Sequence, residues 1–250
     1  MTLIPIADEM ADYWADWKAV APWRFGRTRS LLRQPLMQVS DEDGGLLVTG
    51  RRTLFLAPAQ LHGQFVSGRL KATHPDMLSA LGKIRNAKGD AFEIRVEQTA
   101  KAAGYTRTRR RLRRIGEFDL QDIDGKDLGD IDVAAVDETA KLLLLIEAKS
   151  LEVARTPAEL ANEINALFDD KRSAQLRLST RSEWVKDHLP DTLHALGVKD
   201  AATEWRVVEL IVVSDHLVSQ ELDRDHLDLL AIQDLPRKLH ELSADASHRS

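Results

Sequence analysis

Residues 129–149 read GDIDVAAVDETAKLLLLIEAK and predict two neighbouring β-strands. Residues 131–136 and 142–148 read as strands, and the second contains the continuous apolar run 142–146, which is typical of a strand buried on both faces. The four residues 137–140 form a short turn between them. A turn of this length makes the two strands antiparallel and adjacent.

Charged residues stand at the ends of these two strands. Because side chains alternate along a strand, Asp130 and Asp132 share one face of the first strand, and Glu147 and Lys149 share one face of the second. Carboxylates gathered at one sheet edge repel each other and tend to protonate unless a cation neutralises them. Carboxylate ligands favour a hard ion, Mg²⁺ or Mn²⁺, that also takes phosphate oxygens.

The composition excludes several classes of protein. The chain has 250 residues, a charge of −5, 43% apolar residues and no cysteine. This length allows one or two globular domains. The missing cysteines exclude disulfides, thiolate metal sites, iron–sulfur clusters and cysteine nucleophiles. No apolar run approaches the roughly 20 residues that cross a bilayer, and the N-terminus has acids where a secretory signal is basic. We therefore expect a cytoplasmic protein with no membrane partner.

The charge is divided sharply along the chain. Residues 83–114 contain eleven Lys or Arg and three acids, whereas residues 117–138 contain nine acids and one Lys. The basic run is typical of a nucleic-acid groove, and the side chains that we predict to contact phosphates are Arg107, Arg109, Arg111 and Arg113. A solvated surface, in which these arginines pair with the acidic segment, would give the same pattern.

The remaining elements are predicted from local patterns. Three short strands are expected at residues 35–39, 46–50 and 53–57, and two more at 205–213 and 227–232. Helices are expected at 8–20, 78–85 and 90–103, from Pro157 to about 178, on both sides of Pro190, and at 236–242. Three of the five tryptophans, Trp14, Trp17 and Trp23, concentrate near the N-terminus, where they could form a small core or a docking face.

Three short motifs occur in a characteristic order. They are Lys88-Gly89-Asp90-Ala91-Phe92-Glu93, Gly129-Asp130-Ile131-Asp132-Val133 and Ile146-Glu147-Ala148-Lys149. Together they resemble the PD-(D/E)XK nuclease superfamily, in the branch that includes Mrr-type restriction endonucleases, NERD-domain proteins and archaeal Holliday-junction resolvases. The strands and helix of residues 205–242 are also similar to the end of the Mrr type, so the resemblance covers residues 84–242.

The resemblance implies a fold and a division of the chain. The expected fold is an α/β, restriction-endonuclease-like core with a central mixed β-sheet flanked by helices. This nuclease-like domain would span residues 83–243. A small α+β region of unknown role would precede it at 1–82, and a flexible tail would follow at 244–250.

The resemblance also implies roles for individual residues. Asp132, Glu147 and the carbonyl group of Ala148 would ligate Mg²⁺, for which Mn²⁺ could substitute. Lys149 would orient the attacking water or help to deprotonate it, and Glu93 would hold a metal-bound water. Asp130 stands where the family commonly has glutamate, and it could share or replace the role of Asp132.

The expected activity is metal-dependent hydrolysis of phosphodiester bonds, in DNA more than in RNA. The protein could act as a homodimer or as the effector domain of a larger defence or repair assembly. The alternative is a catalytically inactive module of the nuclease fold that binds nucleic acid or a protein partner. A strand pair with salt-bridged ends would also carry this pattern of charges without any catalytic role.

Overall fold

The computed structural model divides the chain into two compact units. The first comprises Met1–Ala87 and Thr156–Ala158, and the second comprises Lys88–Arg155 and Glu159–Ser250. The residues that the structure describes are 35–38, 47–122, 124–154, 157–169, 173–199, 201, 204–221 and 228–247. The predicted helix 8–20 and the three clustered tryptophans, Trp14, Trp17 and Trp23, lie outside the described residues.

The first unit contains a short hairpin and a helix. Strands β1 (Met37–Gln38) and β2 (Leu47–Val48) lie within two of the predicted strands and pair antiparallel. The strand predicted at 53–57 is wrong, because these residues belong to helix α3 (Arg51–Val66). The alternating leucines suggested a strand, but the run continues through a stretch rich in Leu, Ala and Gln, which favour helix.

Helix α4 (Pro75–Ala102) carries residues of both units. Two separate helices were expected at 78–85 and 90–103, and that expectation is wrong because the helix continues through Gly89. One interior glycine costs about 1 kcal/mol, which the burial of a few apolar side chains outweighs. Gly104 follows close after the helix with a φ of 102°, so it ends the helix in the left-handed conformation, near the predicted end at residue 103.

A mixed five-stranded sheet forms the centre of the second unit. Its strands, in spatial order, are β3 (Arg107–Leu112), β6 (Ile131–Asp137), β7 (Leu142–Lys149), β8 (Arg206–Val213) and β9 (Leu229–Ala231). Strands β6 and β7 pair antiparallel, which confirms the hairpin predicted for them. Strands β7, β8 and β9 are parallel. The second unit is therefore α/β with a central mixed sheet. Beside it, β4 (Arg114–Ile115) and β5 (Phe118–Asp119) form a small separate hairpin.

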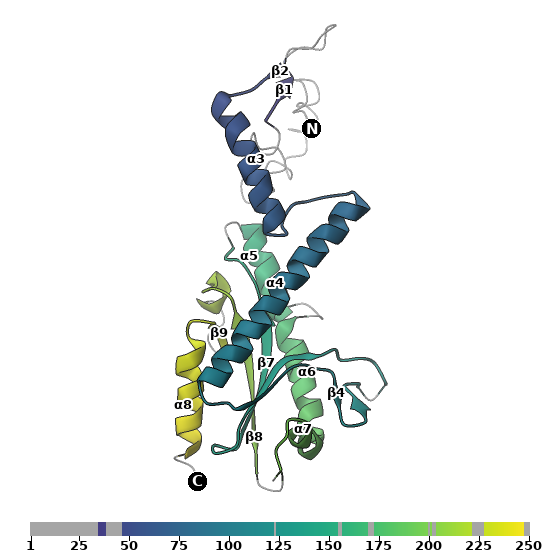
Figure 1. The fold of residues 1–250 in the computed structure, drawn as a ribbon, viewed down its shortest axis with the longest axis vertical. Helices are drawn as coiled ribbons and strands as arrows, with labels where there is room; N and C mark the ends of the chain where they lie inside the picture. The colour runs from purple at the N-terminus through teal and green to yellow at the C-terminus, as the bar shows by residue number, and fades with distance from the viewer. Residues whose placement is uncertain are drawn as a thin grey trace. The chain divides into compact units, whose positions relative to one another are not determined.

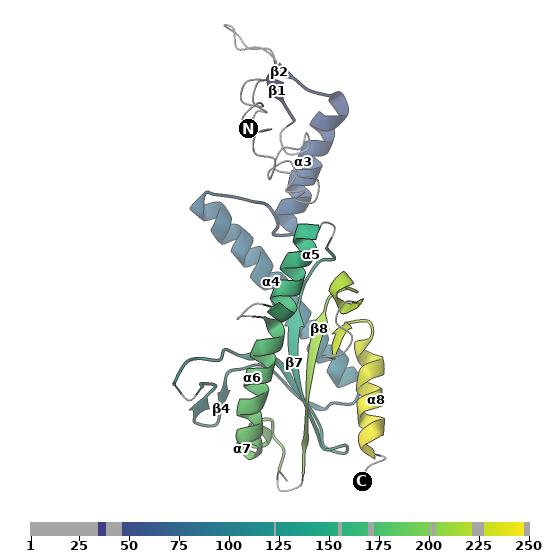
Figure 2. The same cartoon turned by 180° about the vertical axis from the view of Figure 1, so that it is seen from behind.

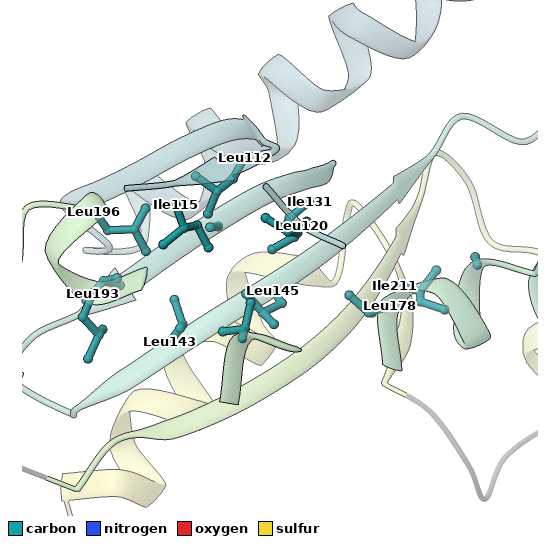
Figure 3. Close-up of a cluster of buried hydrophobic side chains, with 14 of the residues drawn as sticks. Leu112, Ile115, Leu120, Ile131, Leu143, Leu145, Leu178, Leu193, Leu196 and Ile211 are labelled. Carbon is teal, nitrogen blue, oxygen red and sulfur yellow. The ribbon is translucent and has the colours of Figure 1, made fainter. Parts of the chain in front are cut away.

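Helices cover both faces of this sheet. Helices α4 and α8 (Leu235–Ser247) lie over one face (Figure 1). Helices α6 (Ala174–Asp187) and α7 (Leu189–Ala195) lie over the other, where Leu143 and Leu145 pack against them (Figures 2 and 3). Strand β7 is consequently buried on both sides, which is why its sequence is apolar without alternation.

The segment after β7 differs from the single helix predicted there. Helix α5 (Pro157–Ile164) begins with proline as expected and continues into a π-helical turn (Asn165–Asp169). A new helix, α6, begins after Ser173, whose hydroxyl accepts a hydrogen bond from the Leu176 N–H at 3.3 Å. This serine is an N-cap inside a run that otherwise looked continuously helical.

The last part of the chain is close to its prediction. The helices around Pro190, the long strand β8 and the short strand β9 are present. A short 3₁₀ helix, Val218–Glu221, lies between these two strands. Helix α8 extends through Ser247 rather than ending at residue 242, so the first residues of the expected tail are helical.

Candidate active site

The acidic ends of β6 and β7 meet at one place in the sheet. Val133 pairs with Ile146, and Asp132 and Glu147 are the next residues in this antiparallel register. The Asp132 carboxylate accepts a hydrogen bond at 2.8 Å through Oδ2 from the backbone N–H of Ala148. The predicted convergence of these two strand ends is therefore confirmed.

Glu147 is a buried carboxylate held by two cations. The residue is only 1% exposed. Its Oε1 lies 2.5 Å from Nζ of Lys149, and its Oε2 accepts a hydrogen bond at 2.6 Å from Nη1 of Arg181. A buried charge is tolerated only where such partners replace water. Both oxygens of the predicted metal ligand are thus already bonded.

Arg181 connects helix α6 to this strand end. It is 4% exposed, and its Nε donates a hydrogen bond at 2.8 Å to the carbonyl oxygen of Leu128. Its Nη2 packs against Gly129, where an added Cβ would lie 2.9 Å from that nitrogen. Gly129 has a φ of 80°, so both its backbone conformation and the close guanidinium favour glycine. The structure therefore gives a physical reason for the glycine before Asp130.

Sequence reasoning did not single out Arg181, although a signal for it exists. Helix α6 buries Leu178 and Val185, which lie three residues before Arg181 and four residues after it. Arg181 therefore occupies the apolar stripe of an otherwise amphipathic pattern. A charged residue at such a position is buried with a partner or is functional.

Asp132 lies in an unfavourable electrostatic environment. Burial, and next the negative charge of Glu147, raise its pKa from 3.8 to about 7. Lys149 and the Ala148 N–H act in the opposite direction but do not offset these effects, and Glu93 raises the pKa further. Burial and negative charge around Asp132 thus outweigh the nearby positive charge, an environment that favours the binding of a cation.

Arg111 lies opposite Asp132 in the sheet, but its positively charged side chain bonds to other residues. It stands opposite Asp132, between the paired residues Arg110 and Val133 on one side and Leu112 and Ile131 on the other. Its backbone is left-handed, with a φ of 51°.

The Arg111 side chain bonds to helix α4 rather than to Asp132. Its Nε lies 2.8 Å from Oε2 of Glu93, and its Nη2 lies 2.9 Å from Oδ1 of Asp90. The hydrogen bond and the charge of Glu93 are the main causes that raise the pKa of Arg111. Glu93, predicted to hold a metal-bound water, is here the acceptor of an ion pair with β3 and acts on Asp132 through its charge.

The predicted phosphate-binding arginines, three on β3 and Arg113 directly after it, mostly bond to neighbouring residues. Nε of Arg107 lies 2.6 Å from Oε1 of Glu138, and Arg113 pairs with Asp127. Among the four arginines, Arg109 is the one without a carboxylate partner in the described part of the chain. Its Nη1 donates to the carbonyl oxygen of Ala195 at 3.4 Å. Arg107 and Arg113 thus pair with the acidic segment, as the alternative interpretation expected, whereas Arg111 pairs with Asp90 and Glu93 of α4.

The donors at the strand ends suit a hard cation. Asp132 and Glu147 stand opposite each other, and the Ala148 N–H points toward Asp132. The N–H and C=O of one strand residue point the same way, so the Ala148 carbonyl opens on this side too. Within the described ranges, no three acidic or histidine side chains are already grouped to hold a metal ion. The oxygen ligands available at the strand ends, two carboxylates and a carbonyl, are of the type that Mg²⁺ or Mn²⁺ prefers.

These observations define an α/β protein with a buried acidic site at the ends of its central strands. A family model described as anti-phage protein Upx-like matches residues 8–185, which include the whole site. The chain belongs to the Upx-like anti-phage protein family, and this membership indicates a role in defence. No curated protein and no solved structure matches the chain. No helix in the described ranges is both long and apolar enough to cross a membrane.

Proposed function

We propose that this protein is a metal-dependent nuclease that acts in anti-phage defence and hydrolyses phosphodiester bonds, in DNA rather than RNA. The observation that carries the proposal is the opposition of Asp132 and Glu147 at the ends of two central antiparallel strands, with Lys149 bonded to Glu147. The likeness of Asp132, Glu147 and Lys149 to the PD-(D/E)XK motifs also supports a restriction-endonuclease-like core.

The residues would divide the chemistry as follows. Asp132, Glu147 and the Ala148 carbonyl would hold Mg²⁺ or Mn²⁺, which when bound polarises a phosphoryl oxygen and lowers the pKa of a coordinated water. The ammonium of Lys149 would orient that water and stabilise the charge that develops on the phosphate. Glu93 would contribute negative charge from α4, where two arginines hold it in place.

Two observations favour an alternative, a nuclease-fold module that binds nucleic acid or a protein partner without cleaving. Both oxygens of Glu147 are bonded to cations of the chain itself. Arg111 and Glu93 form an ion pair with each other. A fold that has lost catalysis could keep such pairs for stability alone. The two candidates differ in whether the purified protein breaks phosphodiester bonds.

A cleavage assay separates them. The full chain is incubated with supercoiled, linear, single-stranded and branched DNA and with RNA, each with Mg²⁺, Mn²⁺ or EDTA. We expect cleavage of at least one DNA form with either metal and none with EDTA. The matched variants are Lys149→Ala and Lys186→Ala. Lys186 is a half-exposed lysine on α6 that pairs with Glu209. Binding without cleavage under all conditions would favour the alternative.

A further inference from the structure

Each oxygen of Glu147 faces a cation of the chain itself, so a metal ion that binds this carboxylate would come close to a positive charge. Lys149 takes Oε1 at 2.5 Å, and Arg181 takes Oε2 at 2.6 Å. Each oxygen keeps a second lone pair, but repulsion between a divalent cation and the adjacent ammonium or guanidinium favours displacement of one of these two partners. The structure shows which of the two is easier to displace.

Arg181 is fixed at three points. Besides Glu147, its guanidinium bonds to the Leu128 carbonyl at 2.8 Å, and Gly129 closes against Nη2. It is 4% exposed, so moving it from Glu147 would leave a buried guanidinium without its counter-charge. Removing one partner of a buried ion pair is among the more costly changes in a folded protein.

Lys149 is much less constrained. Its side chain is 31% exposed, and Glu147 is the partner of its ammonium among the described residues. A lysine carries its charge on a flexible stem and is strongly hydrated, so its ammonium can move into water at small cost. The exchangeable position on Glu147 is therefore Oε1.

We propose that Arg181 is a positioning residue that holds Oε2 of Glu147, while Oε1 exchanges between Lys149 and a divalent cation. Cation binding then releases the Lys149 ammonium from Glu147, so that it becomes available to water or phosphate at the same site. This inference rests on the proposed function and adds a form of regulation to it: the Lys149 ammonium stays bonded to Glu147 until a divalent cation binds.

The proposal gives opposite effects for the two cations. Lys149→Ala removes a competitor for Oε1, so Mn²⁺ should bind about 10-fold more tightly. Arg181→Gln loosens Glu147, so Mn²⁺ should bind at least 10-fold more weakly. Arg181→Lys keeps a positive charge but not the fork that reaches both Glu147 and Leu128, so it should restore part of the lost affinity.

The test uses Mn²⁺ as the probe and does not depend on activity. Calorimetric titration of the full chain gives the affinities of the wild type, these three variants and the control Lys186→Ala, with circular dichroism to show that each is folded. Amine-reactive labelling, read by mass spectrometry, reports the accessibility of Lys149. Labelling of Lys149 in the wild type should rise several-fold when Mn²⁺ is added, whereas that of Lys186 should not change.

The outcomes separate the inference from the proposed function. Equal Mn²⁺ affinity in the wild type and Lys149→Ala, with constant labelling of Lys149, would overturn the exchange and leave the nuclease proposal standing. Absence of Mn²⁺ binding and of cleavage in the wild type would overturn the nuclease proposal itself. Should Arg181→Gln not fold, Arg181→Lys decides its role, because unchanged affinity there would reduce Arg181 to a structural residue.

Discussion

The end of β7 and strand β3 both carry dense charge, but they treat it differently. At the end of β7, Glu147 is 1% exposed and Arg181 is 4% exposed, and each bonds to partners fixed by the sheet or by α6. On β3, the side chains of Arg107 and its partner Glu138 are 39% and 42% exposed. The same residue types thus form a buried site in one region and a solvated surface in the other.

This difference decides what each charge contributes. An exposed ion pair stabilises a protein by roughly 0 to 1 kcal/mol, because water screens it and two long side chains lose freedom. Breaking a buried pair costs several kcal/mol, since the charge left behind has no solvent. Counting charges along the sequence singles out β3. In the structure, the ion pairs whose loss should cost the most stability are those of Glu147.

The sharpest test of the comparison is catalytic. Lys149→Ala should lower the cleavage rate by about 10²- to 10³-fold, because the ammonium acts on charge that develops in the transition state. Nucleic-acid affinity and the folded state should change little, as the side chain is partly exposed. Rates under single-turnover conditions, measured beside Lys186→Ala, check this expectation. Full activity of Lys149→Ala would remove the lysine from the site.

A second test compares two glutamates by stability. Glu147→Gln leaves Arg181 buried without a counter-charge, so the free energy of unfolding should fall by about 3 kcal/mol. Glu138→Gln removes only the exposed partner of Arg107 and should cost less than about 1 kcal/mol. Denaturant unfolding of both variants without metal measures the contrast. Equal losses would show that burial does not separate the two regions.

The sequence predicted the second unit better than the first, for reasons that particular residues make clear. The apolar run of β7 and the short turn before it were sufficient to predict that the charged ends of the two strands converge, and the structure adds the register that sets Asp132 opposite Glu147. Arg111 bonds to Glu93 from a left-handed backbone conformation, and no pattern of residue types in the sequence predicts that conformation. Arg181 is far from Glu147 in the sequence, and its bond to this carboxylate is seen only once α6 is packed on the sheet.

A third test uses the pH dependence of Asp132. Burial and Glu147 raise its folded pKa to about 7, above the ordinary 3.8, so the folded state keeps this proton longer than the unfolded state. Its contribution to stability is therefore present below about pH 4, and it is lost as the pH rises to about 7.

The variant that isolates this contribution is Asp132→Asn, whose amide oxygen can still accept the Ala148 N–H. It should raise the free energy of unfolding by about 2 kcal/mol at pH 8 without metal and by little at pH 4. Glu147→Gln would also remove one of the two mutually repelling carboxylates, but it leaves the buried Arg181 without its counter-charge, so its effect on stability has the opposite sign. A stability difference that does not vary with pH would mean that Asp132 titrates normally.

The smallest expected effects distinguish two arginines on β3. Arg109 has no carboxylate partner among the described residues, whereas Arg107 is paired with Glu138. If β3 contacts the phosphates of duplex DNA, Arg109→Gln should make the negative slope of log K against log salt less steep by roughly 0.9. The stability of the protein should not change. Arg107→Gln should instead lower stability by about 0.5 kcal/mol with a smaller change in slope, because its charge is already neutralised. Binding titrations at several salt concentrations, paired with thermal unfolding, measure both quantities. An unchanged slope for Arg109→Gln would leave the basic strand as a structural surface with no part in substrate binding.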